Sequence, residues 1–245
     1  MNRISLILIL ALAATGCSIY RPQAVDIPLL ETDGETRIDA AVGVSTSLLP
    51  DAVTFNGTAS HAFTDHVAGQ AHVNLGSGVY YMQVAPGLFK KLGEKGVLEG
   101  YAGVGYGGSL SRSGTVTPDE GESYSYDYDG RYGLVFAQGN IGWRHLGPFE
   151  VAFGLKVGGL LPDFDYYKFS SDDPNQITSH EHYNRFNLLL EPQLQLRLGS
   201  EHVKFTTRLG YTWLSDMDQQ GTLYAGSEHF IHDLFTLSVG LNFTL

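Results

Sequence analysis

The chain has 245 residues, a formal net charge of −11 at pH 7 and 12% aromatic residues. Only 15 Lys and Arg stand against 26 Asp and Glu, which disfavours a nucleic-acid partner because phosphate contacts need basic side chains. The single cysteine excludes an internal disulfide and a zinc site of several thiolates. Past the first fifteen residues, no apolar run approaches the roughly 20 residues of a membrane helix, although a membrane β-barrel escapes that criterion.

The first 16 residues have the organisation of an export signal. Met1-Asn2-Arg3 is a short basic start, and the apolar stretch from Ile4 to Ala14 is too short to span a bilayer. It runs into Ala14-Thr15-Gly16-Cys17, which resembles the lipobox of bacterial lipoproteins, where the cysteine is acylated and becomes the new N-terminus. We therefore expect removal of residues 1–16 and a covalent lipid on Cys17; the alternative is an ordinary signal peptide with a chance cysteine.

Residues 17–35 are predicted to form a lipidated N-terminal tether. Pro22, Pro28 and the Asp33-Gly34 pair suit an extended linker. Ser18, in place of Asp, follows the cysteine, which resembles the signal that sorts lipoproteins to the outer membrane. Several acyl chains on one cysteine would make the anchoring stable.

The remaining residues, 36–245, alternate apolar and polar side chains with a period of two. Near the end of the chain, Phe235, Leu237 and Val239 begin a series separated by small and polar residues. Such alternation predicts strands with one apolar and one polar face. The pattern predicts ten strands, at 36–46, 52–63, 67–75, 79–92, 97–111, 130–145, 149–161, 183–198, 203–215 and 230–245. Eight strands are the alternative, since each segment carries a weak signal.

Alternation alone does not separate a soluble β-sandwich from a membrane barrel, because only the direction of the apolar face differs. The alternating runs are about 10–14 residues long, enough to cross a bilayer. Tight turns alternate with connections that are mostly longer, the longest being 112–129, 162–182 and 216–229. The polar face is rich in glycine, which suits a narrow lumen: Gly43, Gly103, Gly105, Gly107, Gly154 and Gly158. These features predict an all-β, antiparallel up-and-down transmembrane β-barrel.

In this barrel, apolar side chains such as Phe153, Leu190 and Tyr211 should face lipid. An even number of strands places both ends of the barrel domain beside the short turns. That arrangement fits a lipid on Cys17 in the inner leaflet.

Side chains of both charge signs are predicted to face the lumen. The predicted charge network comprises Glu99, Lys156, Glu191, Arg197 and Arg208. Because buried charges need partners, we expect the two glutamates to pair with these basic residues. The network forms either a polar plug that holds a narrow barrel together, or part of a gated pore or small-solute site.

The longer connections are acidic and rich in tyrosine, notably at 119–129, and we expect a solvated external face there. Two groups of histidines were candidates for acid–base catalysis or metal binding: His180 and His182 near Asp172 and Asp173, and His229 and His232 near Asp233. Neither an EF-hand nor a serine-hydrolase motif is present in the sequence. We therefore expect no catalytic residue, no metal site and no cofactor besides the lipid on Cys17.

The last eight residues resemble the C-terminal assembly signal of bacterial outer-membrane barrels, with Gly240, Phe243 and Leu245 at its defining positions. Taken with the lipobox, the chain resembles the small outer-membrane β-barrel lipoproteins of Bacteroidota-type bacteria, a largely uncharacterised family. The resemblance implies a bacterial outer-membrane location. It also implies three partners: outer-membrane lipid, the barrel-assembly machinery and the lipoprotein-sorting machinery.

These observations favour a non-enzymatic, lipid-anchored outer-membrane barrel with outward-facing loops and a lumen that is plugged or narrowly conducting. The main alternative is a small-solute channel. Further alternatives are a hydrolase at the barrel rim and a soluble periplasmic β-sandwich or lipocalin-like binder. The sequence leaves the oligomeric state open.

Overall fold

The computed structural model describes residues 20, 23, 25–46, 50–76, 78–112, 124–170, 176–215, 222–225, 228–231 and 235–245. The predicted signal peptide, Cys17 and the acidic stretch at 119–122 lie outside the described residues. Within the described part of the chain, no helix is long and apolar enough to span a bilayer.

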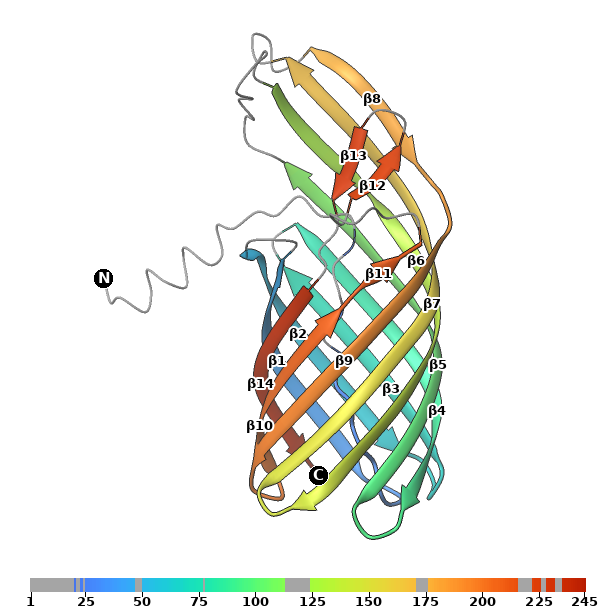
Figure 1. The fold of residues 1–245 in the computed structure, drawn as a ribbon, viewed down its shortest axis with the longest axis vertical. Helices are drawn as coiled ribbons and strands as arrows, with labels where there is room; N and C mark the ends of the chain where they lie inside the picture. The colour runs from blue at the N-terminus through green and yellow to red at the C-terminus, as the bar shows by residue number, and fades with distance from the viewer. Residues whose placement is uncertain are drawn as a thin grey trace, which may run out of the picture.

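Ten antiparallel strands form a closed barrel (Figure 1). Each strand pairs with its neighbours along the barrel, and the last strand closes onto the first, with Val42 opposite Val239. The predicted ten-strand, up-and-down barrel is therefore confirmed. The barrel strands are β1 (Thr36–Thr46), β2 (Pro50–Ala62), β3 (Val67–Gly76), β4 (Val79–Leu92), β5 (Gly96–Arg112), β6 (Tyr124–Leu146), β7 (Phe149–Ser170), β9 (Asn187–Gly199), β10 (Val203–Tyr211) and β14 (Phe235–Thr244).

Two strands extend far beyond the others at the long-loop end. β6 and β7 remain paired up to Tyr124 and Ser170, and β8 (Ile177–Tyr183) pairs with the outer part of β7. The sequence had predicted a loop at 162–182. β7 continues because Phe164 and Tyr166 keep the alternation and are buried on its inner face.

Three short strands complete the long-loop end. β11 (Trp213–Leu214) pairs with β9, and β12 (Thr222–Ala225) pairs with β13 (Glu228–Ile231) in a separate hairpin. The final strand, predicted at 230–245, therefore begins only at Phe235.

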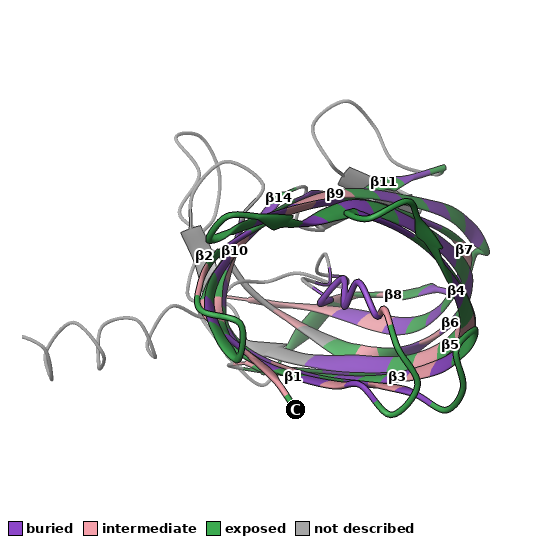
Figure 2. Ribbon diagram, turned by 90° about the horizontal axis from the view of Figure 1, so that it is seen from below, coloured by how far each residue is buried: buried purple, intermediate pink, exposed green. Residues whose placement is uncertain are grey.

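Most of the large apolar side chains on the strands point outward, as predicted. Phe153 is 50% exposed, whereas Lys156 on the same strand is 4% exposed, and Figure 2 shows the resulting alternation of exposed and buried residues around the barrel. On β7 the exposed apolar series ends at Leu161, and Asp163 and Asp165 take the next outward positions. The outer part of β7 therefore rises above the apolar band that faces lipid.

Glycines on the inner face of β5 make room for aromatic rings in the long-loop half of the lumen. A Cβ on Gly107 would lie 2.5 Å from the Tyr132 ring, and a Cβ on Gly103 would lie 2.8 Å from the Phe136 ring and collide with the carbonyl oxygen of Val84. Tyr132 stacks on Tyr81 with 5.9 Å between ring centroids. These glycines therefore suit the narrow lumen, as predicted, because they leave space for aromatic rings to pack.

We predict that Gly103→Ala lowers the free energy of unfolding by about 1–3 kcal/mol, because the added methyl group overpacks a strand face that has no room for it. Gly139→Ala is the matched control, since no atom lies within 4 Å of its Cβ position. The control should change stability by less than about 0.5 kcal/mol. Urea unfolding in lipid vesicles measures both values; equal effects of the two substitutions would contradict this account of the glycines.

Candidate functional site in the barrel lumen

The lumen contains the chain's own N-terminal segment. Val25, Ile27, Leu29 and Leu30 are at most 1% exposed, and Figure 2 shows this stretch as a buried trace inside the ring of strands. We call Tyr20, Gln23 and residues 25–35 the lumenal segment. Residues 25–30 were expected to be part of an extended tether, and the structure places them inside the barrel instead.

From its first residue to its last, the lumenal segment runs from the long-loop half of the barrel to the short-turn end. Its last residue, Glu35, contacts Arg144 near the end of β6 that leads into a short turn. Its first residue, Tyr20, packs edge-on against Tyr132 with 5.2 Å between ring centroids, and Tyr132 lies much farther along β6 toward the long loops.

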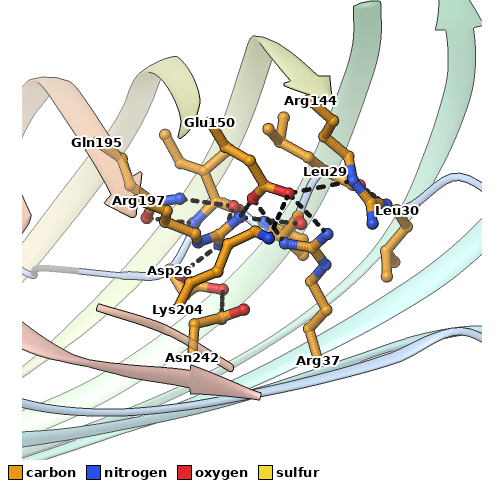
Figure 3. Close-up of polar contacts among 12 residues, drawn as sticks. Asp26, Leu29, Leu30, Arg37, Arg144, Glu150, Gln195, Arg197, Lys204 and Asn242 are labelled. Carbon is orange, nitrogen blue, oxygen red and sulfur yellow. Dashed lines mark hydrogen bonds and ion pairs between the residues drawn. The ribbon is translucent and has the colours of Figure 1, made fainter. Parts of the chain in front are cut away.

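Asp26 is held by three side chains of the barrel wall. Its Oδ1 accepts from Arg197 Nη2 at 2.7 Å and from Arg208 Nη2 at 2.9 Å. Its Oδ2 accepts from Asn242 Nδ2 at 3.2 Å. All four side chains are at most 1% exposed, and Figure 3 shows Asp26 between Arg197 and Asn242. Both carboxylate oxygens are therefore satisfied by donors from β9, β10 and β14.

Glu150 is a second point at which cations converge. Its carboxylate lies 3.1 Å from Arg37 Nη1, 3.0 Å from Arg197 Nη1 and 3.3 Å from Arg144 Nε. Lys204 Nζ lies 3.8 Å away. Since Arg197 contacts both carboxylates, Asp26 and Glu150 belong to one ionic network (Figure 3).

Glu35 fixes the base of the lumenal segment. It lies 2.8 Å from Arg144 Nη1 and 3.1 Å from Arg37 Nε. Burial alone would raise the pKa of Glu35, but the positive charges of Arg144 and Arg37 outweigh that effect and lower the pKa below its ordinary value. Arg144 also donates to the carbonyl oxygen of Leu29 at 2.9 Å, so one arginine binds both a side chain and the backbone of the segment.

The carboxylates of the lumenal segment balance the charge of the wall. Within the described residues, the largely buried groups joined to Asp26 and Glu150 by a continuous series of ion pairs form what we call the ionic cluster. Its wall members are Arg37, Arg144, Arg197, Lys204, Arg208, Asp39 and Glu150, and its segment members are Asp26, Glu31 and Glu35. Five cations thus face two carboxylates on the wall, and the segment contributes the other three.

Wall side chains also satisfy the backbone of the lumenal segment. Gln195 accepts from the Ile27 N–H at 3.0 Å and donates to the Ile27 carbonyl oxygen at 2.8 Å. Gln70 donates to the carbonyl oxygen of Asp26, and Gln193 donates to that of Val25. Because buried peptide groups need partners, these glutamines do for the segment what a neighbouring strand does in a sheet.

The residues of the predicted charge network lie in the lumen, but their bonding partners differ from those predicted. Lys156 lies 3.4 Å from Glu191, which also accepts from the Tyr20 hydroxyl at 2.8 Å. Glu99 accepts from the Leu30 N–H at 2.8 Å and from Asn140 at 3.2 Å, with no ion pair to the predicted basic residues. Beside Lys156 and Glu191 the unfilled space measures about 10 Å³, room for roughly one water.

Sequence reasoning missed Asp26, Arg37, Asp39, Arg144 and Glu150 as network members. Arg37, Asp39 and Glu150 alternate with outward-facing apolar residues, so strand periodicity could have placed them in the lumen. Asp26 carried no such signal, because it precedes the first strand.

The predicted assembly signal forms most of β14. Gly240 pairs with Ala41 and Thr206, and a Cβ there would lie 2.6 Å from the Ala41 side chain. Phe243 pairs with Ile38 and Val203, whereas Leu245 is 75% exposed. Recognition of these residues during assembly stays a prediction.

The candidate rim histidines lie on the outer face of the β7–β8 extension. His180 Nε2 lies 2.9 Å from Asp165 Oδ1, and His182 Nδ1 lies 3.2 Å from the same oxygen. The expected neighbours Asp172 and Asp173 are outside the described residues, as are the side chains at 229, 232 and 233. Among the described residues, no group of three or more His, Cys, Asp or Glu is arranged to hold a metal ion.

Comparison with known proteins shows a fold and no family. No family model matches the chain, and no curated protein matches it. Among solved structures, the outer membrane protease OmpT from Escherichia coli is similar with a TM-score of 0.54 at 10% identity, over 87% of this chain and 97% of that one. The KdgM porin matches at TM-score 0.41 and 12% identity, over 85% of this chain and 99% of that one. The translocator domain of the autotransporter NalP from Neisseria meningitidis matches at 0.45 and 14%, over 87% and 89%.

The protein is therefore an outer-membrane β-barrel by fold. At this level of identity, the similarity extends to the fold alone and assigns no activity.

Proposed function

We propose that the protein is a non-enzymatic outer-membrane barrel whose lumen is closed by its own N-terminal segment, and that it conducts small solutes only when this segment is displaced. The contacts of Asp26 with Arg197, Arg208 and Asn242 carry the proposal. They place a residue from outside the barrel strands at the centre of a buried ionic network, where removal of one partner typically costs about 3–5 kcal/mol.

The contacts of the segment are suited to reversible closure. Among the described residues, 25–33 contact the wall through hydrogen bonds that involve side chains, ion pairs and a few apolar side chains. Backbone pairing with the wall is found at Gly34 and Glu35, which both bond to Ala62 at the short-turn end. Displacement would therefore leave every barrel strand with its neighbours in place. The barrel can accordingly open without unfolding.

Single-channel recording in planar bilayers tests closure by the segment. Asp26→Asn should produce conductance steps, because it removes the charge that holds the segment to two arginines. Wild type and Asp33→Asn should remain closed; Asp33 is the matched control because it lies on the same segment and is exposed.

An engineered disulfide between the lumenal segment and the wall tests whether conductance requires displacement of the segment. A Cβ on Gly154 would lie 3.5 Å from Ile27 Cγ1, so Ile27→Cys and Gly154→Cys together can join the segment to β7. In an Asp26→Asn, Cys17→Ser background, oxidation of this pair should abolish the steps and reduction should restore them. Steps that persist unchanged in the oxidised variant, or a silent Asp26→Asn variant, would contradict closure by the segment.

We also propose that Cys17 carries the lipid and that its acyl chains emerge at the long-loop end while the lumenal segment is in place. Cys17 lies three positions before Tyr20 in the chain, a reach of at most about 11 Å. Tyr20 contacts Tyr132 in the long-loop half of the lumen. A lipid that emerges at the long-loop end differs from the lipid in the inner leaflet that the sequence predicts.

Labelling and fractionation test the anchor. Wild type should incorporate radioactive palmitate and Cys17→Ala should not, yet both should remain in the membrane fraction because the barrel itself is embedded. An epitope inserted between Ser18 and Ile19 should bind antibody on intact cells. A soluble Cys17→Ala protein would contradict the barrel as an independent membrane anchor, and an epitope detected only after permeabilisation would contradict the proposed direction.

We propose that the rim histidines brace the β7–β8 extension rather than catalyse a reaction. Both imidazoles share the Asp165 carboxylate, and the His180 ring stacks on Tyr167 at 4.6 Å. Peptide and lipid hydrolysis by wild type and His182→Ala should both equal the rate of the protein-free buffer. Turnover by wild type that His182→Ala abolishes would contradict this role.

A further inference from the structure

The donors around Asp26 define a recognition site that does not depend on the identity of Asp26 itself. Two guanidinium groups and one amide converge on a single carboxylate, and all three come from the barrel wall. We infer that Arg197, Arg208 and Asn242 form a binding site for the carboxylate of a small organic acid, which Asp26 occupies in the closed barrel. The inference rests on the proposed function, since a solute reaches the site only when the segment is displaced.

The wall holds the two guanidinium groups in place independently of Asp26. Arg208 Nε donates to Gln195 Oε1 at 2.8 Å, and Arg208 also pairs with Asp39 on β1. Arg197 Nη1 lies 3.0 Å from Glu150 on β7. The donors are therefore preorganised by residues of the barrel strands, which lowers the cost of binding a ligand.

The charge around the site favours a monovalent anion. Without the segment, the ionic cluster retains five cations and two wall carboxylates, so an anion is attracted into the lumen. However, Asp39 and Glu150 each pair directly with one of the two arginines. A dianion such as hydrogen phosphate would bring its second charge close to these carboxylates, whereas a monocarboxylate would not.

The neighbouring amides indicate what should lie next to the carboxylate. Gln195 binds both the N–H and the carbonyl oxygen of Ile27, and Gln70 donates to the carbonyl oxygen of Asp26. When the segment leaves, Gln195 keeps its bond to Arg208 and Gln70 keeps its bond to Ser60, but each amide loses the bonds it made to the segment backbone and can bond to a solute in their place. The preferred solute is therefore a small monocarboxylic acid whose body carries hydroxyl or amide groups.

Chemical rescue tests the site with acetate as the probe. Asp26→Ala removes the carboxylate and leaves space for acetate, so acetate should stabilise this variant. When acetate reaches about ten times its dissociation constant, the midpoint of thermal unfolding in detergent should rise by roughly 3 °C relative to chloride at equal ionic strength. Wild type and Asp33→Ala should show no difference between acetate and chloride.

A further variant defines the outcome. Asp26→Ala combined with Arg208→Gln should lose the response, because it removes one of the two guanidinium donors of the site. If Asp26→Ala does not fold in chloride, the refolding yield in acetate replaces the midpoint, and acetate should increase it. An Asp26→Ala variant that behaves identically in acetate and chloride, or rescue that persists with Arg208→Gln, would overturn the inference. Because the readout is stability, the result is separate from that of the conductance test.

Discussion

The pairing of Asp26 with Arg197 and Arg208 is the interaction on which the organisation of the lumen depends. These arginines are fully enclosed by the barrel, and a buried cation is tolerated only when carboxylates and hydrogen-bond acceptors surround it. The wall alone supplies too few carboxylates for its five cations in the ionic cluster. The lumenal segment supplies the missing carboxylates, those of Asp26, Glu31 and Glu35. The charge of the ionic cluster is therefore balanced when the segment occupies the bore.

The presence of the segment in the lumen also explains how the two halves of the barrel differ. In the short-turn half, ion pairs and glutamine amides surround the segment. In the long-loop half, Tyr20 meets the stacked rings of Tyr81 and Tyr132, for which glycines on β5 leave space. The polar contacts fix the path of the segment, and the aromatic contacts fill the volume beyond it.

The barrel was predictable from the sequence because its pattern is local. Alternation such as that of Phe153 and Lys156 fixes which side chains face lipid, and it correctly placed Arg197 and Arg208 inside. The outer part of β7 was missed because a proline such as Pro162 normally indicates the end of a strand, although Phe164 and Tyr166 continue the alternation. Most of the site was not predictable, since Asp26 gains its role from residues more than 150 positions away in the chain. Short, proline-containing segments carry no periodicity that would reveal burial.

The lumenal segment should occupy the bore when the folded barrel is in a membrane. The rate at which a membrane-impermeant maleimide labels single cysteines in lipid vesicles, in a Cys17→Ser background, tests this occupation. The account predicts that Ile27→Cys, which replaces a fully buried side chain, is protected until the protein is unfolded in urea, while the exposed position Asp33→Cys is labelled at once. Equal labelling of both positions in the folded barrel would show that the segment lies in water, and would contradict the account.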